Sequence, residues 1–81
     1  MLSAREQFVL RYLHEGTFME ANERMIGEAM VRAGDEYSRN QPYRVAHGVV
    51  MSLWRKGLAY RLPELRAWRI TSAGRDALTA G

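Results

Sequence analysis

Residues 54–78 read "WRKGLAYRLPELRAWRITSAGRDAL" and hold five of the chain's eleven arginines, its single lysine and both tryptophans. After Gly57 the apolar residues recur at every second position, which is the spacing of a strand with one buried face. A turn-like stretch, Pro63–Arg66, interrupts this alternation, and it resumes at Trp68. The pattern predicts a β-hairpin over residues 58–70.

Helices are predicted on both sides of this hairpin. Before it, apolar residues recur at helical spacing through residues 42–56, and Pro42 occupies the first helical position, where proline is favoured. The residue that caps this helix is Asn40 or Gln41. After the hairpin, Thr71 is placed to cap a short last helix.

The N-terminal segment has the signature of a capped helix. Ser3 and Glu6 form a capping box, in which the hydroxyl and the carboxylate each bind a free backbone N–H. Val9 and Leu13 belong to the apolar residues that follow at helical spacing. These features predict a helix over residues 4–15.

Another helix is predicted within residues 18–33. Thr17 and Glu20 repeat the capping-box pattern in front of an apolar stripe. The first two residues of the range are also compatible with a short strand. Residues 34–41 are polar and are predicted to form a loop.

The expected element order is therefore α-α-α-β-β-α. With 81 residues the chain makes one domain, because smaller pieces could not bury a useful core. A composition of 47% hydrophobic and 26% charged residues is ordinary for a globular protein. The predicted fold class is mainly α with a small β-hairpin, an α+β domain.

Several classes of protein are excluded or disfavoured by composition. The absence of cysteine excludes disulfides and thiolate metal sites. The longest uncharged run, Val45–Trp54, has ten residues, whereas a membrane-spanning helix needs about 20. No apolar segment follows a basic one at the N-terminus, so no secretory signal is expected. We expect a cytoplasmic protein without a membrane partner.

The sequence offers no catalytic constellation. Its two histidines, His14 and His47, are 33 positions apart and are not grouped with carboxylates at metal-ligand spacing. Neither a phosphate-binding G-x-x-x-x-G-K-[ST] loop nor a G-x-S-x-G nucleophile elbow occurs. We therefore expect a protein that is not an enzyme and needs no cofactor.

Charge is distributed unevenly along the chain. Residues 1–38 contain four arginines and seven acidic residues, a net charge of −3. Residues 39–81 contain seven arginines and Lys56 but only two acidic residues, a net charge of +6. Such asymmetry indicates one face directed at polyanions.

The residues around the predicted hairpin follow a recurring order. A helix ends in a leucine, a few charged residues and Gly-Leu, and two strands lead to Thr-x-x-Gly-Arg at the start of the next helix. The residues in this order are Leu53, Gly57, Leu58, Trp68, Ile70, Thr71, Gly74 and Arg75. Over residues 42–78 the chain resembles the winged helix-turn-helix family, particularly the PadR-like group of transcriptional regulators. The connection before residue 42, about eight residues, is longer than in the compact helix-turn-helix.

The resemblance implies a small transcriptional regulator that binds double-stranded DNA. Helix 42–56 would read the major groove, and the 58–70 wing would contact the flanking backbone or the minor groove. The candidate DNA-binding residues are Arg39, Asn40, Tyr43, Arg44, His47, Arg55, Arg61, Arg66 and Arg69. One module reads few base pairs, so a homodimer on a pseudo-palindrome is expected. Trp68 and Trp54 are interpreted as packing residues of the core and of its rim, respectively, rather than as base-stacking platforms.

An alternative interpretation is a protein-interaction module. A small phage or mobile-element protein could use the same winged helix to dock on a host complex without binding DNA. The acidic first half of the chain favours this alternative, and a fold of this type does not fix function.

Overall fold

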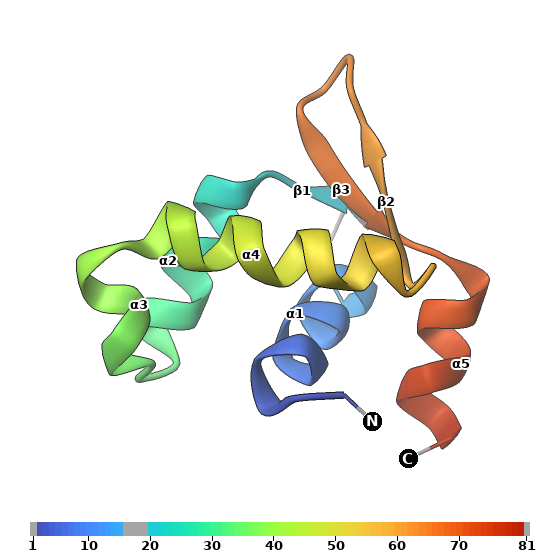
Figure 1. Ribbon diagram of the computed structural model, residues 1–81, viewed down its shortest axis with the longest axis horizontal. Helices are drawn as coiled ribbons and strands as arrows, with labels where there is room; N and C mark the ends of the chain where they lie inside the picture. The colour runs from blue at the N-terminus through green and yellow to red at the C-terminus, as the bar shows by residue number, and fades with distance from the viewer. Residues whose placement is uncertain (1, 16–19, 81) are drawn as a thin grey trace.

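The computed structural model describes residues 2–15 and 20–80, which form five helices and three short strands. In chain order the elements are α1 (Ala4–Glu15), β1 (Glu20–Ala21), α2 (Glu23–Arg32), α3 (Glu36–Asn40), α4 (Pro42–Arg55), β2 (Ala59–Leu62), β3 (Ala67–Ile70) and α5 (Ser72–Ala80). Helices come first, the hairpin of β2 and β3 follows, and a helix ends the described chain (Figure 1). The predicted mainly helical α+β class is confirmed.

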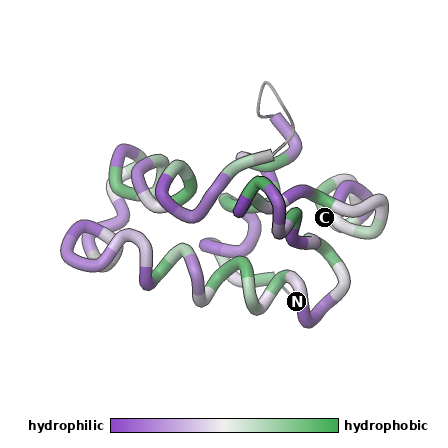
Figure 2. The backbone as a smooth tube through the Cα atoms, turned by 90° about the horizontal axis from the view of Figure 1, so that it is seen from above, coloured by the Kyte–Doolittle hydropathy of each residue, from purple (hydrophilic) through white to green (hydrophobic). Residues whose placement is uncertain are grey.

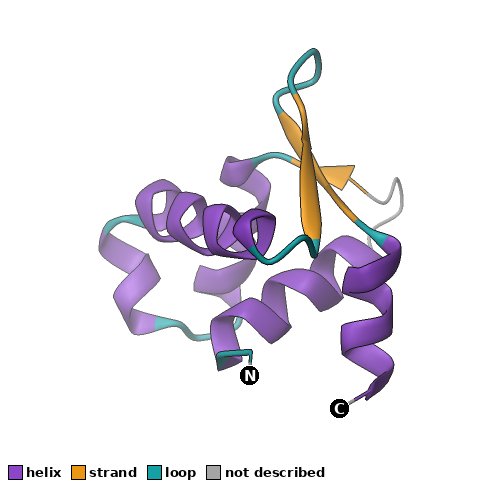
Figure 3. Cartoon of the chain, turned by 45° about the vertical axis from the view of Figure 1, so that its right-hand side comes forward, coloured by secondary structure: helices purple, strands orange, loops and turns teal. Residues whose placement is uncertain are grey.

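The hairpin belongs to a small antiparallel sheet. Its central strand, β3, pairs with β2 on one side and with the two-residue strand β1 on the other. The hairpin stands away from the helices above the C-terminal half of α4 (Figures 1 and 3). Its turn contains Arg66 at a φ of 50°. The strands occupy residues 59–62 and 67–70 of the predicted range 58–70.

The second helix, Glu23–Arg32, lies within the predicted range 18–33, but it begins later than the capping pattern of Thr17 and Glu20 indicated. Glu20 lies in β1, opposite Arg69 of β3, and Thr17 lies outside the described residues. The helix begins after Asn22 instead, whose side-chain oxygen accepts a hydrogen bond from the Met25 N–H at 2.8 Å. The predicted capping box with Glu20 is therefore wrong, because Glu20 pairs with β3 in the sheet and Asn22 caps the helix instead.

A short helix, α3, lies within the segment 34–41 that was expected to be a loop. Asp35 caps it by accepting a hydrogen bond from the Ser38 N–H at 3.2 Å. Arg5 of α1 holds the same carboxylate with hydrogen bonds of 2.7 and 3.1 Å. These bonds from Arg5 are the main reason that the pKa of Asp35 falls from 3.8 to about 2. Five residues without apolar periodicity give no helical pattern, so the sequence did not predict α3.

Ser38 is fully buried in α3, and its hydroxyl group has no hydrogen-bond partner among the described residues. A buried polar group without a partner costs about 1–3 kcal/mol. We expect Ser38→Ala to raise the free energy of unfolding by about 1 kcal/mol, as measured by urea titration. Ser72→Ala, at an exposed helical serine, is the control. A lower stability for Ser38→Ala would contradict the prediction.

The hydrophobic core lies between α1, α2, α4 and one face of the sheet. Its buried residues are Val9, Leu10, Leu13, Ala21, Ile26, Met30, Ala46, Val50, Leu53, Ala59, Trp68 and Ile70. Hydrophobic and hydrophilic positions alternate along the helices (Figure 2), as in helices with one buried side. At Gly27, α2 approaches α4 so closely that a Cβ atom would lie 2.7 Å from the Pro42 carbonyl oxygen.

The motif residues on both sides of the hairpin meet in space. Thr71 donates its hydroxyl to the Gly57 carbonyl at 2.8 Å and its N–H to the Leu58 carbonyl at 3.0 Å. The same hydroxyl accepts a hydrogen bond from the Gly74 N–H at 3.0 Å and so caps α5 as predicted. Gly57 ends α4 at a φ of 74°, which favours glycine. The motif is therefore the joint between the end of α4 and the start of α5.

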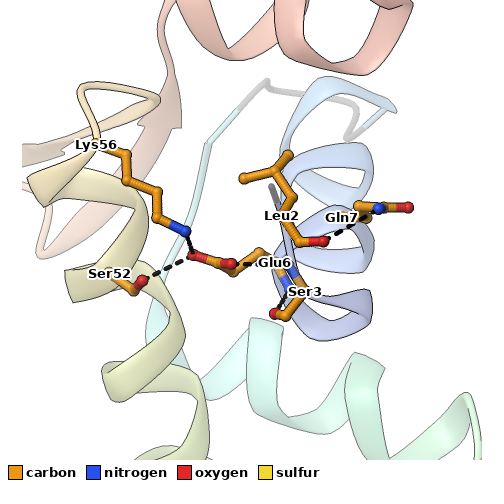
Figure 4. Close-up of polar contacts among 6 residues, drawn as sticks. All are labelled: Leu2, Ser3, Glu6, Gln7, Ser52 and Lys56. Carbon is orange, nitrogen blue, oxygen red and sulfur yellow. Dashed lines mark hydrogen bonds and ion pairs between the residues drawn. The ribbon is translucent and has the colours of Figure 1, made fainter. Parts of the chain in front are cut away.

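A buried carboxylate ties the beginning of α1 to the end of α4 (Figure 4). The capping box is confirmed, since Glu6 accepts from the Ser3 N–H at 2.9 Å and donates its own N–H to the Ser3 hydroxyl at 3.1 Å. The other carboxylate oxygen accepts hydrogen bonds of 2.7 Å from Lys56 and from Ser52. Burial raises the pKa of Glu6, but hydrogen bonds from Lys56, Ser3 and Ser52 together lower it from 4.5 to about 2.

This carboxylate predicts an acid-sensitive contribution to stability. Because the folded pKa of Glu6 is depressed, its ionised form stabilises the fold above pH 4.5, and the effect is lost as the pH falls towards 2. We expect Glu6→Gln to lower the free energy of unfolding by about 2–3 kcal/mol at pH 7 and by much less near pH 2. Urea titrations across this range measure the difference. Glu64→Gln, at an exposed turn position, should show no such pH dependence, and equal losses for Glu6→Gln at both ends would contradict the prediction.

Candidate nucleic-acid interface

The two long sides of α4 differ in character. Ala46, Val50 and Leu53 are buried against α1, α2 and the sheet. The opposite side carries Arg44 and Arg55, which are both exposed. At 3.6 residues per turn they lie within about 20° of each other around the helix axis and about 16 Å apart along it. They therefore share one solvent-facing side of the helix.

Glu23 of α2 connects that helix to α4 and to β3. One of its carboxylate oxygens lies 2.9 Å from Nδ1 of His47 in α4 and accepts a hydrogen bond from the Trp68 indole N–H of β3 at 3.3 Å. In the neutral tautomer that carries its hydrogen on Nδ1, His47 donates a hydrogen bond to Glu23, and Nε2 is then a hydrogen-bond acceptor. Trp68 is only 3% exposed, so its interpretation as a packing residue is confirmed.

The hairpin arginines do not all lie on the same face. Arg61 is opposite Trp68, on the face that packs against the helices. Arg69 is opposite Tyr60, on the other face, because partners directly across a ladder point to the same side. Arg66 is exposed in the turn. The structure brings Arg61 to the α4 side and leaves Arg69 behind the hairpin.

The remaining predicted residues lie at the other end of α4. Arg39 and Asn40 end α3 and are exposed, and Arg39 makes a long ion pair of 3.8 Å with Glu36. Tyr43 follows in the first turn of α4 and is 52% exposed. The helix is capped by Gln41, although no side-chain hydrogen bond forms there. Across 14 residues, about 20 Å of helix separates this end from the hairpin.

The ion pairs of the described residues involve only some of the basic side chains. The basic groups in these pairs are Arg5, Arg24, Arg39, His47 and Lys56. The remaining arginines make no ion pair within the same described ranges, and four of them, Arg44, Arg55, Arg61 and Arg66, are exposed on α4 and on the hairpin. We call these four arginines the basic surface, and no carboxylate of the described residues pairs with them.

Trp54 was interpreted as a packing residue at the rim of the core and was not among the candidate contact residues. It is 52% exposed, as a residue at the rim can be. Seven positions after His47, it lies within about 20° of that residue around the helix axis, two turns nearer the hairpin. Its position outside the stripe of Ala46, Val50 and Leu53 was the signal for exposure.

The described residues contain no group of three or more His, Asp or Glu side chains that could hold a metal ion. In the same parts of the chain, no helix is long and apolar enough to span a bilayer. Comparison with known protein families, curated proteins and solved structures finds no match for this chain.

Proposed function

We propose that this protein binds double-stranded DNA in a sequence-specific way, as a small transcriptional regulator of the winged helix-turn-helix type. The observation that carries the proposal is the basic surface, whose four arginines lie on one side of α4 and along the adjoining hairpin without carboxylate partners in the described chain. Unneutralised arginines on one face attract a polyanion and release its counterions on binding.

In this proposal α4 enters the major groove, which is about 12 Å wide and admits one helix. Arg44 lies near the N-terminal end of α4, and a hydrogen bond of 3.3 Å to the Gln41 side chain orients it. Its guanidinium group donates two hydrogen bonds, to N7 and to O6 of a guanine. Arg55 and the hairpin residues Arg61 and Arg66 contact phosphates on either side.

His47 is exposed in α4 three residues after Arg44. Its Nδ1 lies 2.9 Å from the Glu23 carboxylate, so Nε2 is the ring nitrogen left to contact a base edge in the groove. His47 thus contributes to base recognition, whereas the arginines supply most of the affinity.

A homodimer would give the module a site of sufficient length. Two copies bind a pseudo-palindrome whose half-sites are centred about 34–36 Å apart, one helical turn of DNA. Neither the partner copy nor the contact between copies is needed for a single module to bind one half-site.

Selection of bound duplexes from a random pool tests the proposal. We expect one enriched motif, and a dissociation constant whose logarithm rises linearly with the logarithm of salt concentration, with a slope of about 0.9 per neutralised phosphate. A titration of the selected duplex against a shuffled one measures the specificity. No enrichment together with no binding at low salt would contradict the proposal.

A second candidate function is docking on another protein. Trp54 and Tyr43 favour it, because each is 52% exposed and such aromatic residues often anchor protein interfaces. In that case Trp54→Ala would abolish a stoichiometric, nuclease-insensitive complex that Arg44→Ala leaves intact. A complex that Arg44→Ala abolishes and Trp54→Ala leaves intact would favour DNA binding.

A further inference from the structure

Gly48 lies in the middle of α4, and no contact with the part of the chain that the structure describes requires a glycine there. It is exposed, and a Cβ atom built there would meet nothing within 4 Å. The other two helical glycines of the described chain are explained by packing, since a Cβ at Gly27 or Gly74 would collide with backbone carbonyl groups. Glycine in a helix interior is less stable than alanine. Its place in α4 therefore points to a partner that approaches the helix backbone closely.

An open groove beside Gly48 marks where this approach occurs. The groove has a volume of about 700 Å³ and lies between α4 and the N-terminal end of α1. Arg44 and Ser52 line it one turn on either side of Gly48. Its acidic residue, Glu6, is already paired with Lys56 at 2.7 Å, whereas Arg44 makes no ion pair in the described chain. The unpaired charge on this groove is positive, which fits a polyanion.

We infer that one strand of the bound duplex packs against α4 at Gly48, and that the missing side chain sets how deeply the helix enters the major groove. This inference rests on the proposed DNA binding. A methyl group at position 48 would hold the strand off by up to about 1.5 Å, the length of one carbon–carbon bond. Hydrogen bonds from Arg44 operate over a range of only about 0.5 Å, so this displacement breaks them.

Gly48→Ala tests the inference, because an alanine side chain fits the free protein. A loss of affinity in this variant therefore cannot be attributed to a folding defect. We expect Gly48→Ala to be more stable to urea-induced unfolding than the wild-type protein. We expect its affinity for the selected duplex to be at least about tenfold lower. Gly48→Leu should bind still more weakly. Ala73→Leu, which adds bulk at an exposed position of α5, should leave the affinity unchanged.

The outcomes separate this inference from the proposal beneath it. If the unchanged protein binds the selected duplex and Gly48→Ala binds it equally well, the role of Gly48 is wrong and DNA binding stands. If the unchanged protein binds no duplex, both are wrong. A loss of stability in Gly48→Ala would also overturn the inference, since the glycine would then have an internal role.

Discussion

Gly74→Ala is expected to lower the midpoint temperature of thermal unfolding by roughly 10–20 °C. A Cβ at this position would lie 2.6 Å from Cγ1 of Ile70 and closer still to the Leu58 carbonyl oxygen. Neither neighbour can move easily, because Ile70 is buried in the core and Leu58 accepts the Thr71 N–H. The methyl group would therefore force α5 away from the end of α4.

The expected loss of stability is about 2–3 kcal/mol, measured by calorimetry or by circular dichroism on heating. Gly48→Ala is the matched control, since it makes the same chemical change in a helix where there is open space. The control should unfold at the same temperature or higher. Equal stability of the two variants would show that the joint at Gly74 is not closely packed.

A triple replacement of Arg44, Arg55 and Arg61 by alanine is expected to weaken binding to the selected duplex by about a thousandfold. All three side chains are exposed, so their removal should change stability little. The salt dependence should become shallower by about 0.9 for each phosphate contact that is lost. Titrations of labelled duplex at several salt concentrations measure both effects.

A matched triple variant separates position from net charge. Arg11, Arg32 and Arg75 lie on α1, α2 and α5 and therefore belong neither to α4 nor to the hairpin. Replacing them by alanine lowers the net charge by the same amount and should weaken binding only slightly. If both triple variants lose affinity equally, the overall charge and not the basic surface is responsible.

Local signals in the sequence predicted the helices and the hairpin well. The capping box at Ser3 marks the start of α1, and Pro42 marks the start of α4. These signals work because a cap satisfies free N–H groups within four residues and needs no distant partner. The joint around Thr71 was visible as a motif, although its hydrogen bonds appear only in three dimensions.

Elements that depend on distant partners could not be predicted. Strand β1 has two residues and exists by pairing with β3, nearly fifty positions later in the chain. Helix α3 is held by Arg5 of α1, thirty positions before Asp35. Neither contact leaves a periodic pattern in the local sequence.

The sequence predicted which residues make up the candidate site but not how these residues are arranged in space. The charge asymmetry identified the second half of the chain, yet Arg61 and Arg69 lie on opposite faces of the hairpin. Their separation depends on the strand register, which the turn residues alone did not fix. The groove at Gly48 requires α1 to lie beside α4, and no local pattern encodes that packing.

The carboxylate that Glu23 shares between His47 and Trp68 has a thermodynamic consequence for the proposed DNA binding. It links α2, α4 and β3 in the free protein, and these contacts restrain the hairpin relative to α4. A preorganised surface loses little conformational entropy on association. In the proposed complex, most of the interaction energy of each contact would then contribute to affinity instead of offsetting the entropy lost in ordering the site.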